Sequence, residues 1–161
     1  MNPTGAVPIA APRFVSRDAM ILVGMSERYE SGANADIPSQ WSRFAPLLGH
    51  VPNEVRGVSY GVVYNVTPDN AFDYLSGVEV TSVADIPDGC VEVRVPANRY
   101  AVFRHTGHVS TIQATFKAIW GRGLAEAGVK AAAAPVFERY DETFDPRTGL
   151  GGFEIWVPIA A

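Results

Sequence analysis

The sequence predicts an α+β fold, in which two tandem β-α-β-β units form a curved antiparallel sheet with two helices on one side. The units would meet in a central groove, a kind of place that ligand sites favour. The main support is a near-repeat of pattern and spacing, in which each half holds an aliphatic run, then a tryptophan, then a second apolar run. These landmarks are Met20, Trp41 and Phe72 in the first half, and Tyr100, Trp120 and Phe153 in the second. Composition agrees with one core, because 47% of the 161 residues are hydrophobic and 19% are charged.

Hydrophobic periodicity defines the start of the first half. Residues 14–26 alternate and then run apolar, which predicts a strand with a bend near Gly24. After a loop at 31–40, Pro38 suits the first turn of a helix. Pro46 ends this helix early, because proline cannot donate the backbone hydrogen bond that a continuing helix needs.

Four strands are predicted in the middle of the chain. Residues 57–66 turn through the sequence TPDN into a strand at 71–80, which makes an antiparallel hairpin. After a connector, residues 90–97 and 100–107 form two more strands, separated by a turn.

The last part of the chain is predicted as one long helix and a closing hairpin. Residues 108–128 form the clearest helix, because apolar residues recur three and four apart and Gly128 supplies a left-handed stop. Strands at 135–144 and 151–159 then close the sheet as a hairpin.

Domain organisation is predicted to be simple. We expect a loose leader at residues 1–12 and a single domain over 13–161, with pseudo-repeats at about 13–82 and 90–161. The start has neither the basic segment nor the long apolar segment of a signal peptide, so we expect a cytoplasmic protein.

Charge and cysteine content exclude several classes of function. The net charge is −4, and the 13 basic residues are dispersed, which argues against a nucleic-acid-binding surface. No apolar run is long enough for a membrane helix. Cys90 is the single cysteine, so no internal disulfide is expected. His105 and His108 fall across a turn with no carboxylate at ligand spacing, so we expect no metal and no cofactor.

Two glutamates are the best candidates for chemistry. In the strand at 151–159, alternation places Glu154 and Trp156 on one face, and that face points to the groove if the helices cover the other. Glu138 and Tyr140 share a face of the preceding strand. A carboxylate beside aromatic rings suits a cationic, partly apolar ligand, because ring faces attract positive charge and the carboxylate neutralises it. Further candidates for the groove walls are Tyr60, Tyr64 and Tyr74.

Structural explanations remain open for all of these residues. A glutamate on an alternating strand is commonly solvent-facing or paired with an arginine, and strand tyrosines commonly pack across strands. Trp41 and Trp120 have apolar neighbours at helical spacing, so core packing is favoured for both.

Several segments in order resemble a known family. They are LVGM, IPSQWSRF, SYGVVY and FDYLSGVEV in the first half, and YAVFRHTGHVSTIQATFKAIW, APVFERYDETF and GGFEIWVPI in the second. Together they cover about residues 14–159 and resemble the GyrI-like (gyrase-inhibitor-like), or AraC-type, bacterial effector-binding domain. The resemblance implies twin β-α-β-β units about a pseudo-twofold axis and a buried glutamate among aromatic residues, and Glu138 matches that glutamate best. It implies a ligand-sensing role, although no helix-turn-helix fits before Phe14.

Three functions follow from the residues and the resemblance together. The favoured one is a stand-alone module, not an enzyme, that binds an aromatic, cationic amphipathic molecule with Glu138 or Glu154 as charge anchor. The alternative is hydrolysis of cyclopropane-containing or other electrophilic natural products, with Glu154 as general base and Trp156 or a tyrosine positioning the ligand. A third is inhibition of DNA gyrase or another protein contact. The expected partner is a small molecule, with no direct contact to nucleic acid or membrane.

Overall fold

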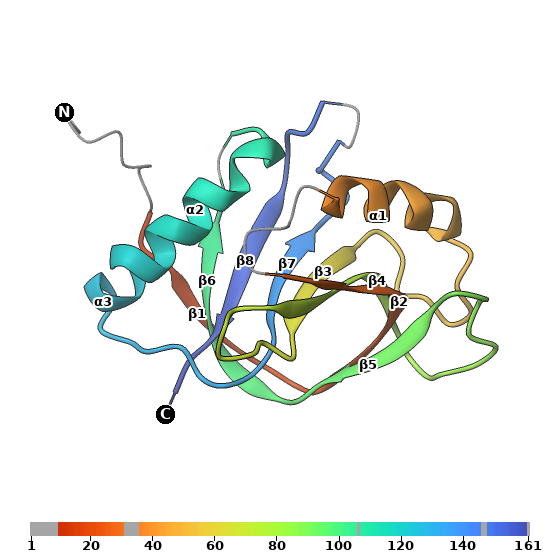
Figure 1. Ribbon diagram of the computed structural model, residues 1–161, viewed down its shortest axis with the longest axis horizontal. Helices are drawn as coiled ribbons and strands as arrows, with labels where there is room; N and C mark the ends of the chain where they lie inside the picture. Colours follow the sequence, from red (N-terminus) through yellow and green to blue (C-terminus); the bar gives the residue numbers. More distant parts are fainter. Residues whose placement is uncertain (1–9, 31–35, 106, 146–147, 161) are drawn as a thin grey trace.

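A computed structural model describes residues 10–30, 36–105, 107–145 and 148–160 (Figure 1). Its strands are β1 (Arg13–Arg17), β2 (Met20–Tyr29), β3 (Ser59–Tyr64), β4 (Phe72–Val80), β5 (Val91–Val95), β6 (Asn98–Arg104), β7 (Val136–Tyr140) and β8 (Phe153–Pro158). Its helical segments are α1 (Ile37–Phe44), η1 (Ala45–Leu47), η2 (Val109–Thr111), α2 (Ile112–Ala118), η3 (Ile119–Gly123) and α3 (Leu124–Glu126). Within this part of the chain, no helix is long and apolar enough to cross a membrane.

All eight strands form one antiparallel sheet in the order β1-β6-β8-β7-β3-β4-β2-β5. This order is symmetric about the β7–β3 pair, with β1 to β4 corresponding to β5 to β8. The first strand of each half lies on the other half: β1 pairs with β6, and β5 pairs with β2. The α+β fold is therefore as predicted, and the two units are interlocked by exchanged edge strands.

The exchange explains where the first predicted strand breaks. Residues 14–26 do not form one strand bent near Gly24, because the chain leaves β1 and enters β2 through residues 18 and 19. Gly24 lies inside β2, opposite Gly77 of β4. A Cβ atom at Gly24 would lie 2.1 Å from the carbonyl oxygen of Ser76, so this glycine allows two backbones to approach closely. The prediction of one strand over residues 14–26 is therefore wrong, and Gly24 serves the close approach of β2 and β4.

Helix α1 and the continuous helical stretch from η2 to α3 cover the same face of the sheet, which we call the helix face (Figure 1). Phe44 of α1 packs against Val23 and Val78, and Ile119 of η3 packs against Ile155. The strand register links these contacts, because Ile155, Glu138, Gly61 and Ser76 are neighbours along one row across four strands. The placement of two helices on one side is confirmed.

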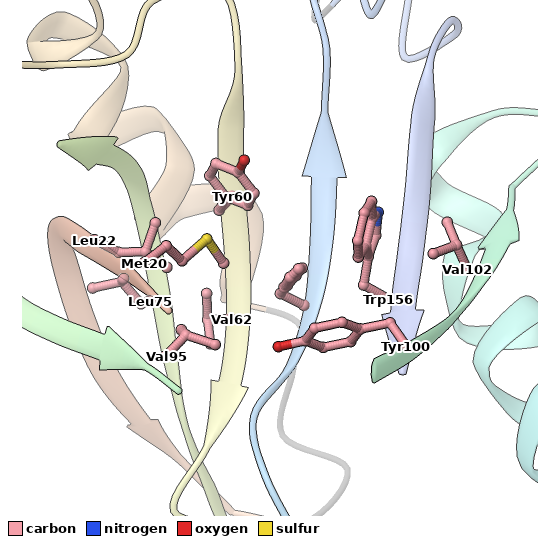
Figure 2. Close-up of a cluster of buried hydrophobic side chains, with 10 residues drawn as sticks. Met20, Leu22, Tyr60, Val62, Leu75, Val95, Tyr100, Val102 and Trp156 are labelled. Atoms are coloured by element: carbon pink, nitrogen blue, oxygen red, sulfur yellow. The ribbon is translucent and has the colours of Figure 1, made fainter. Parts of the chain in front are cut away.

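The opposite face holds a second core, and no helix of the described residues lies over it (Figure 1). Ten buried side chains form it: Met20, Leu22, Tyr60, Val62, Leu75, Val95, Tyr100, Val102, Phe137 and Trp156. Figure 2 shows that Tyr100 and Trp156 from the second half converge there with Tyr60 and Met20 from the first. Residues of β1 and β5 join this cluster although these strands lie at opposite ends of the sheet order, so the sheet curls around it.

The remaining predicted elements agree in position and differ in detail. The hairpins β3–β4 and β7–β8 are confirmed as antiparallel pairs. Strands β5 and β6 follow each other in sequence but pair with different neighbours. The long helix over 108–128 begins as a 3-10 turn and contains the π-turn η3, with Gly128 at φ 73° after its end. Residues 1–9 of the predicted leader, 31–35 of the predicted loop and 146–147 of the last turn lie outside the described residues.

Candidate functional site

The seven residues predicted for the groove lie in two separate clusters. Glu138, Tyr140 and Tyr74 project from the helix face, whereas Glu154, Trp156, Tyr60 and Tyr64 project from the opposite face. The register decides this split, because Glu138 of β7 is opposite Ile155 of β8, and Arg139 is opposite Glu154. Adjacent paired residues share a face of a sheet, so the two glutamates point away from each other.

Glu138 lies at the centre of the helix face, held by two tyrosines. The hydroxyls of Tyr74 and Tyr140 both donate to Glu138 Oε1, each at 2.8 Å. Glu138 is only 7% exposed, and Tyr74 is 1% exposed. On the neighbouring strand Gly61 leaves the space for this arrangement, because a Cβ atom there would lie 2.0 Å from the Tyr74 hydroxyl and 2.6 Å from Oε1.

Helix α1 fixes Tyr74 from above. The indole Nε1 of Trp41 donates to the Tyr74 hydroxyl at 2.9 Å, so that hydroxyl accepts from the helix and donates to Glu138. The fully buried Gln40 donates from Nε2 to the backbone carbonyls of Tyr74 and Met25, both at 2.9 Å. A short helix thus holds the tyrosine at both its backbone and its hydroxyl.

Aromatic rings surround the carboxylate. Tyr140 packs against Trp41 with ring centroids 5.5 Å apart, and against Phe144 and Phe153 at 4.9 Å each. Trp41 and Phe144 are half-buried, whereas Tyr140 and Phe153 are buried. Sequence reasoning assigned Trp41 to the core and did not select Gln40, Gly61, Phe144 or Phe153.

Burial dominates the electrostatics of Glu138. It raises the pKa of Glu138 from 4.5 to about 7, although the hydrogen bonds from Tyr140 and Tyr74 lower it. Burial also raises the pKa of both tyrosines well above the ordinary value, so both remain protonated donors. Among the described residues, no lysine or arginine forms an ion pair with Glu138. Within the described part of the chain, the site is therefore a buried carboxylate without a countercharge, which is unusual in protein interiors.

Glu154 has a different environment on the opposite face. Arg13 donates to Glu154 Oε2 at 2.5 Å, and Trp156 Nε1 donates to Oε1 at 3.2 Å. Burial raises the pKa of Glu154, but the hydrogen bond and charge of Arg13 outweigh it and leave the pKa below its usual value. This carboxylate is compensated by its own arginine. A general base needs a pKa near the working pH, so the pairing with Arg13 does not favour that role for Glu154.

The two tyrosines of the opposite face also have partners within the protein. Tyr60 accepts a hydrogen bond from Arg17 Nη2 at 3.3 Å, and Arg17 pairs with Glu79 at 2.8 Å. The Tyr64 hydroxyl lies 2.6 Å from Ser26 Oγ. The Arg17 contacts join β1 to β3 and β4, and the Ser26–Tyr64 contact joins β2 to β3, so both tyrosines have a structural role.

Other candidate centres in the described part of the chain have structural partners. His105 is buried against Phe153, with Nδ1 2.7 Å from Thr115 Oγ1, and burial lowers its pKa. No cluster of three potential metal ligands occurs among the described residues. Two surface hollows lie elsewhere, one along residues 49–56 and one beside Phe14 and Phe103. Neither Glu138 nor Glu154 lines either of them.

Comparisons with known proteins agree with this fold. A family model described as the GyrI-like small molecule binding domain matches residues 10–160. The transcriptional regulator BrlR of Pseudomonas aeruginosa is 36% identical over 156 residues, which are 91% of this chain and 54% of BrlR. The chain thus spans about half the length of that regulator.

Solved structures with the same fold include a ligand complex. SAV2435 bound to tetraphenylphosphonium has a TM-score of 0.76 and 22% identity, covering 94% of this chain and 95% of that one. An integron cassette protein of Vibrio cholerae has a TM-score of 0.71 and 18% identity, covering 94% and 97%.

Proposed function

This chain belongs to the GyrI-like small molecule binding domain family, and we propose that it captures an aromatic, cationic amphipathic molecule on the helix face, with Glu138 as charge anchor. The observation that carries the proposal is the buried Glu138 carboxylate, which has two tyrosine donors and no paired cation among the described residues. A monovalent cation would supply the missing countercharge.

The surrounding rings support an aromatic ligand. Trp41, Tyr140 and Phe144 offer ring faces or edges within one connected cluster. A cation over one ring gains about 0.5 to 2 kcal/mol, so several rings and a carboxylate together give useful affinity. We infer that the ligand enters beside the half-buried Trp41 and Phe144, which cover Tyr140.

The relatives support the ligand class. SAV2435 was solved with tetraphenylphosphonium, a cation with four aromatic rings, and BrlR is a transcriptional regulator. We propose that this chain shares the capture of such molecules. Glu154 is less suited to the anchor role, because Arg13 already neutralises it.

Binding of tetraphenylphosphonium to matched glutamine variants tests the assignment. At pH 8, Glu138→Gln is expected to bind at least about tenfold more weakly than the wild type, because the lost charge interaction contributes about 1.4 kcal/mol or more. Glu154→Gln is expected to stay within about twofold, since its carboxylate faces the other side of the sheet. Isothermal titration calorimetry gives both values. Loss of affinity in Glu154→Gln with retention in Glu138→Gln would move the anchor to the opposite face.

A further inference from the structure

The two oxygens of Glu138 are not equivalent. Both tyrosine hydroxyls donate to Oε1, and these two hydrogen bonds occupy both lone pairs of that atom. Among the described residues, none donates a hydrogen bond to Oε2. Oε2 is therefore the atom that remains for a ligand, and it is also the atom that carries the proton when the carboxyl is neutral.

The groups packed around Glu138 do not compete for this role. Tyr74 from β4 and Tyr140 from β7 are the titratable groups in contact, and both stay protonated because burial raises their pKa well above 10. The other neighbours among the described residues are uncharged: Gly61 of β3, Ile155 of β8, and Trp41 of α1, which reaches the carboxyl through Tyr74. His105 stacks on the ring of Phe153 and is hydrogen-bonded to Thr115. Arg139, the next residue, faces the opposite side.

We propose that this single site accepts ligands of two opposite classes, cations when Glu138 is ionised and neutral hydrogen-bond acceptors when Oε2 carries a proton. The inference rests on the proposed function and adds a second ligand class to the same carboxyl group. In the ionised form, Oε2 contacts the cation directly. In the neutral form, Oε1 is the carbonyl oxygen that accepts from both tyrosines, and the Oε2 hydroxyl donates to a carbonyl or phosphoryl oxygen of the ligand.

The geometry allows both forms without rearrangement. The tyrosines donate to Oε1 in either state, so the proton is gained or lost at Oε2 alone. The pKa of about 7 means that both forms are populated near neutral pH. A cation selects the ionised form and releases a proton, whereas a neutral acceptor selects the protonated form and takes one up.

Two probes of similar shape test the proposal. Methyltriphenylphosphonium is a permanent cation, and triphenylphosphine oxide is neutral with a strong acceptor oxygen in a similar position. With a pKa of about 7, the ionised fraction rises about tenfold between pH 6 and pH 8. The dissociation constant of the cation is therefore expected to fall about tenfold over this range, and that of the oxide to rise about tenfold. Calorimetric titration at both pH values measures the two opposed trends.

Glu138→Gln provides the matched control, because its amide donates a hydrogen bond but does not titrate. It is expected to bind the oxide with an affinity that does not change with pH, and to bind the cation weakly at both pH values. Any pH trend that persists in this variant belongs to another group. If the variant does not fold, the opposed pH trends of the two probes with the wild type still test the proposal.

The outcomes separate the two proposals. The cation could bind while the two dissociation constants change with pH in the same direction, or do not change with pH. Either result would overturn the dual ligand class and leave the charge anchor intact. Binding of neither probe would overturn the proposed function itself, and the dual class with it.

Discussion

Gly61→Ala is expected to disrupt the centre of the helix face. The new methyl carbon would lie 2.0 Å from the Tyr74 hydroxyl and 2.6 Å from Glu138 Oε1, far inside contact distance. Tyr74 is 1% exposed and is held by Trp41 and Gln40, so it cannot move aside without breaking those contacts. Overpacking and the loss of a charge-assisted hydrogen bond together predict a destabilisation of about 2 to 5 kcal/mol. Urea unfolding of the variant measures it, and tetraphenylphosphonium binding should be lost.

Gly121→Ala is the matched control for this substitution. Gly121 lies in η3, and a Cβ atom there would meet nothing within 4 Å. Alanine is favoured over glycine in helices, so this variant is expected to be neutral or slightly more stable. Equal stability of the two alanine variants would mean that the Tyr74–Glu138 contact yields easily, and the site would not be the rigid arrangement described above.

Periodicity predicts the faces of individual strands well. Alternation correctly grouped Glu138 with Tyr140, and Glu154 with Trp156. It also implied that both groups share one groove, and that relation depends on the register between β7 and β8. A shift of one residue would place Glu138 opposite Glu154, with both carboxylates on the same face. Nothing in the local sequence of either strand fixes that register.

The residues that sequence reasoning missed act through contacts distant in the chain. Trp41 resembles an ordinary core residue of an amphipathic helix, and it is connected to the site only through residues distant in the chain, by its hydrogen bond to Tyr74, 33 positions away, and its ring contact with Tyr140. Gly61 resembles a simple interruption of a strand until the Tyr74 hydroxyl is seen over it. The exchange of β1 and β5 between halves is likewise invisible to local pattern, because edge strands read alike whichever half they join.

The two glutamates are expected to affect stability with opposite dependence on pH. The pKa of Glu138 is about 7 in the folded state and near its ordinary value of 4.5 in the unfolded chain. Its contribution to stability is therefore complete below about pH 4.5 and decreases as the pH rises to about 7, since the unfolded chain ionises more easily. Glu154 has a lowered pKa, so its contribution is present at neutral pH and is lost as the pH falls through its folded-state pKa.

Chemical unfolding of the glutamine variants between pH 5 and pH 8 measures both effects. Glutamine does not ionise, so Glu138→Gln is expected to gain about 2 to 3 kcal/mol of stability over the wild type as the pH rises across this range. Glu154→Gln should instead be less stable than the wild type at pH 8, because Arg13 loses its partner. A constant difference between Glu138→Gln and the wild type would mean that Glu138 ionises at its ordinary pKa despite burial. The expected gain relates stability to function. A countercharge near residue 138, or a neutral side chain at that position, would make the domain more stable. The ionised carboxylate that lowers its stability is the group available to bind a cation.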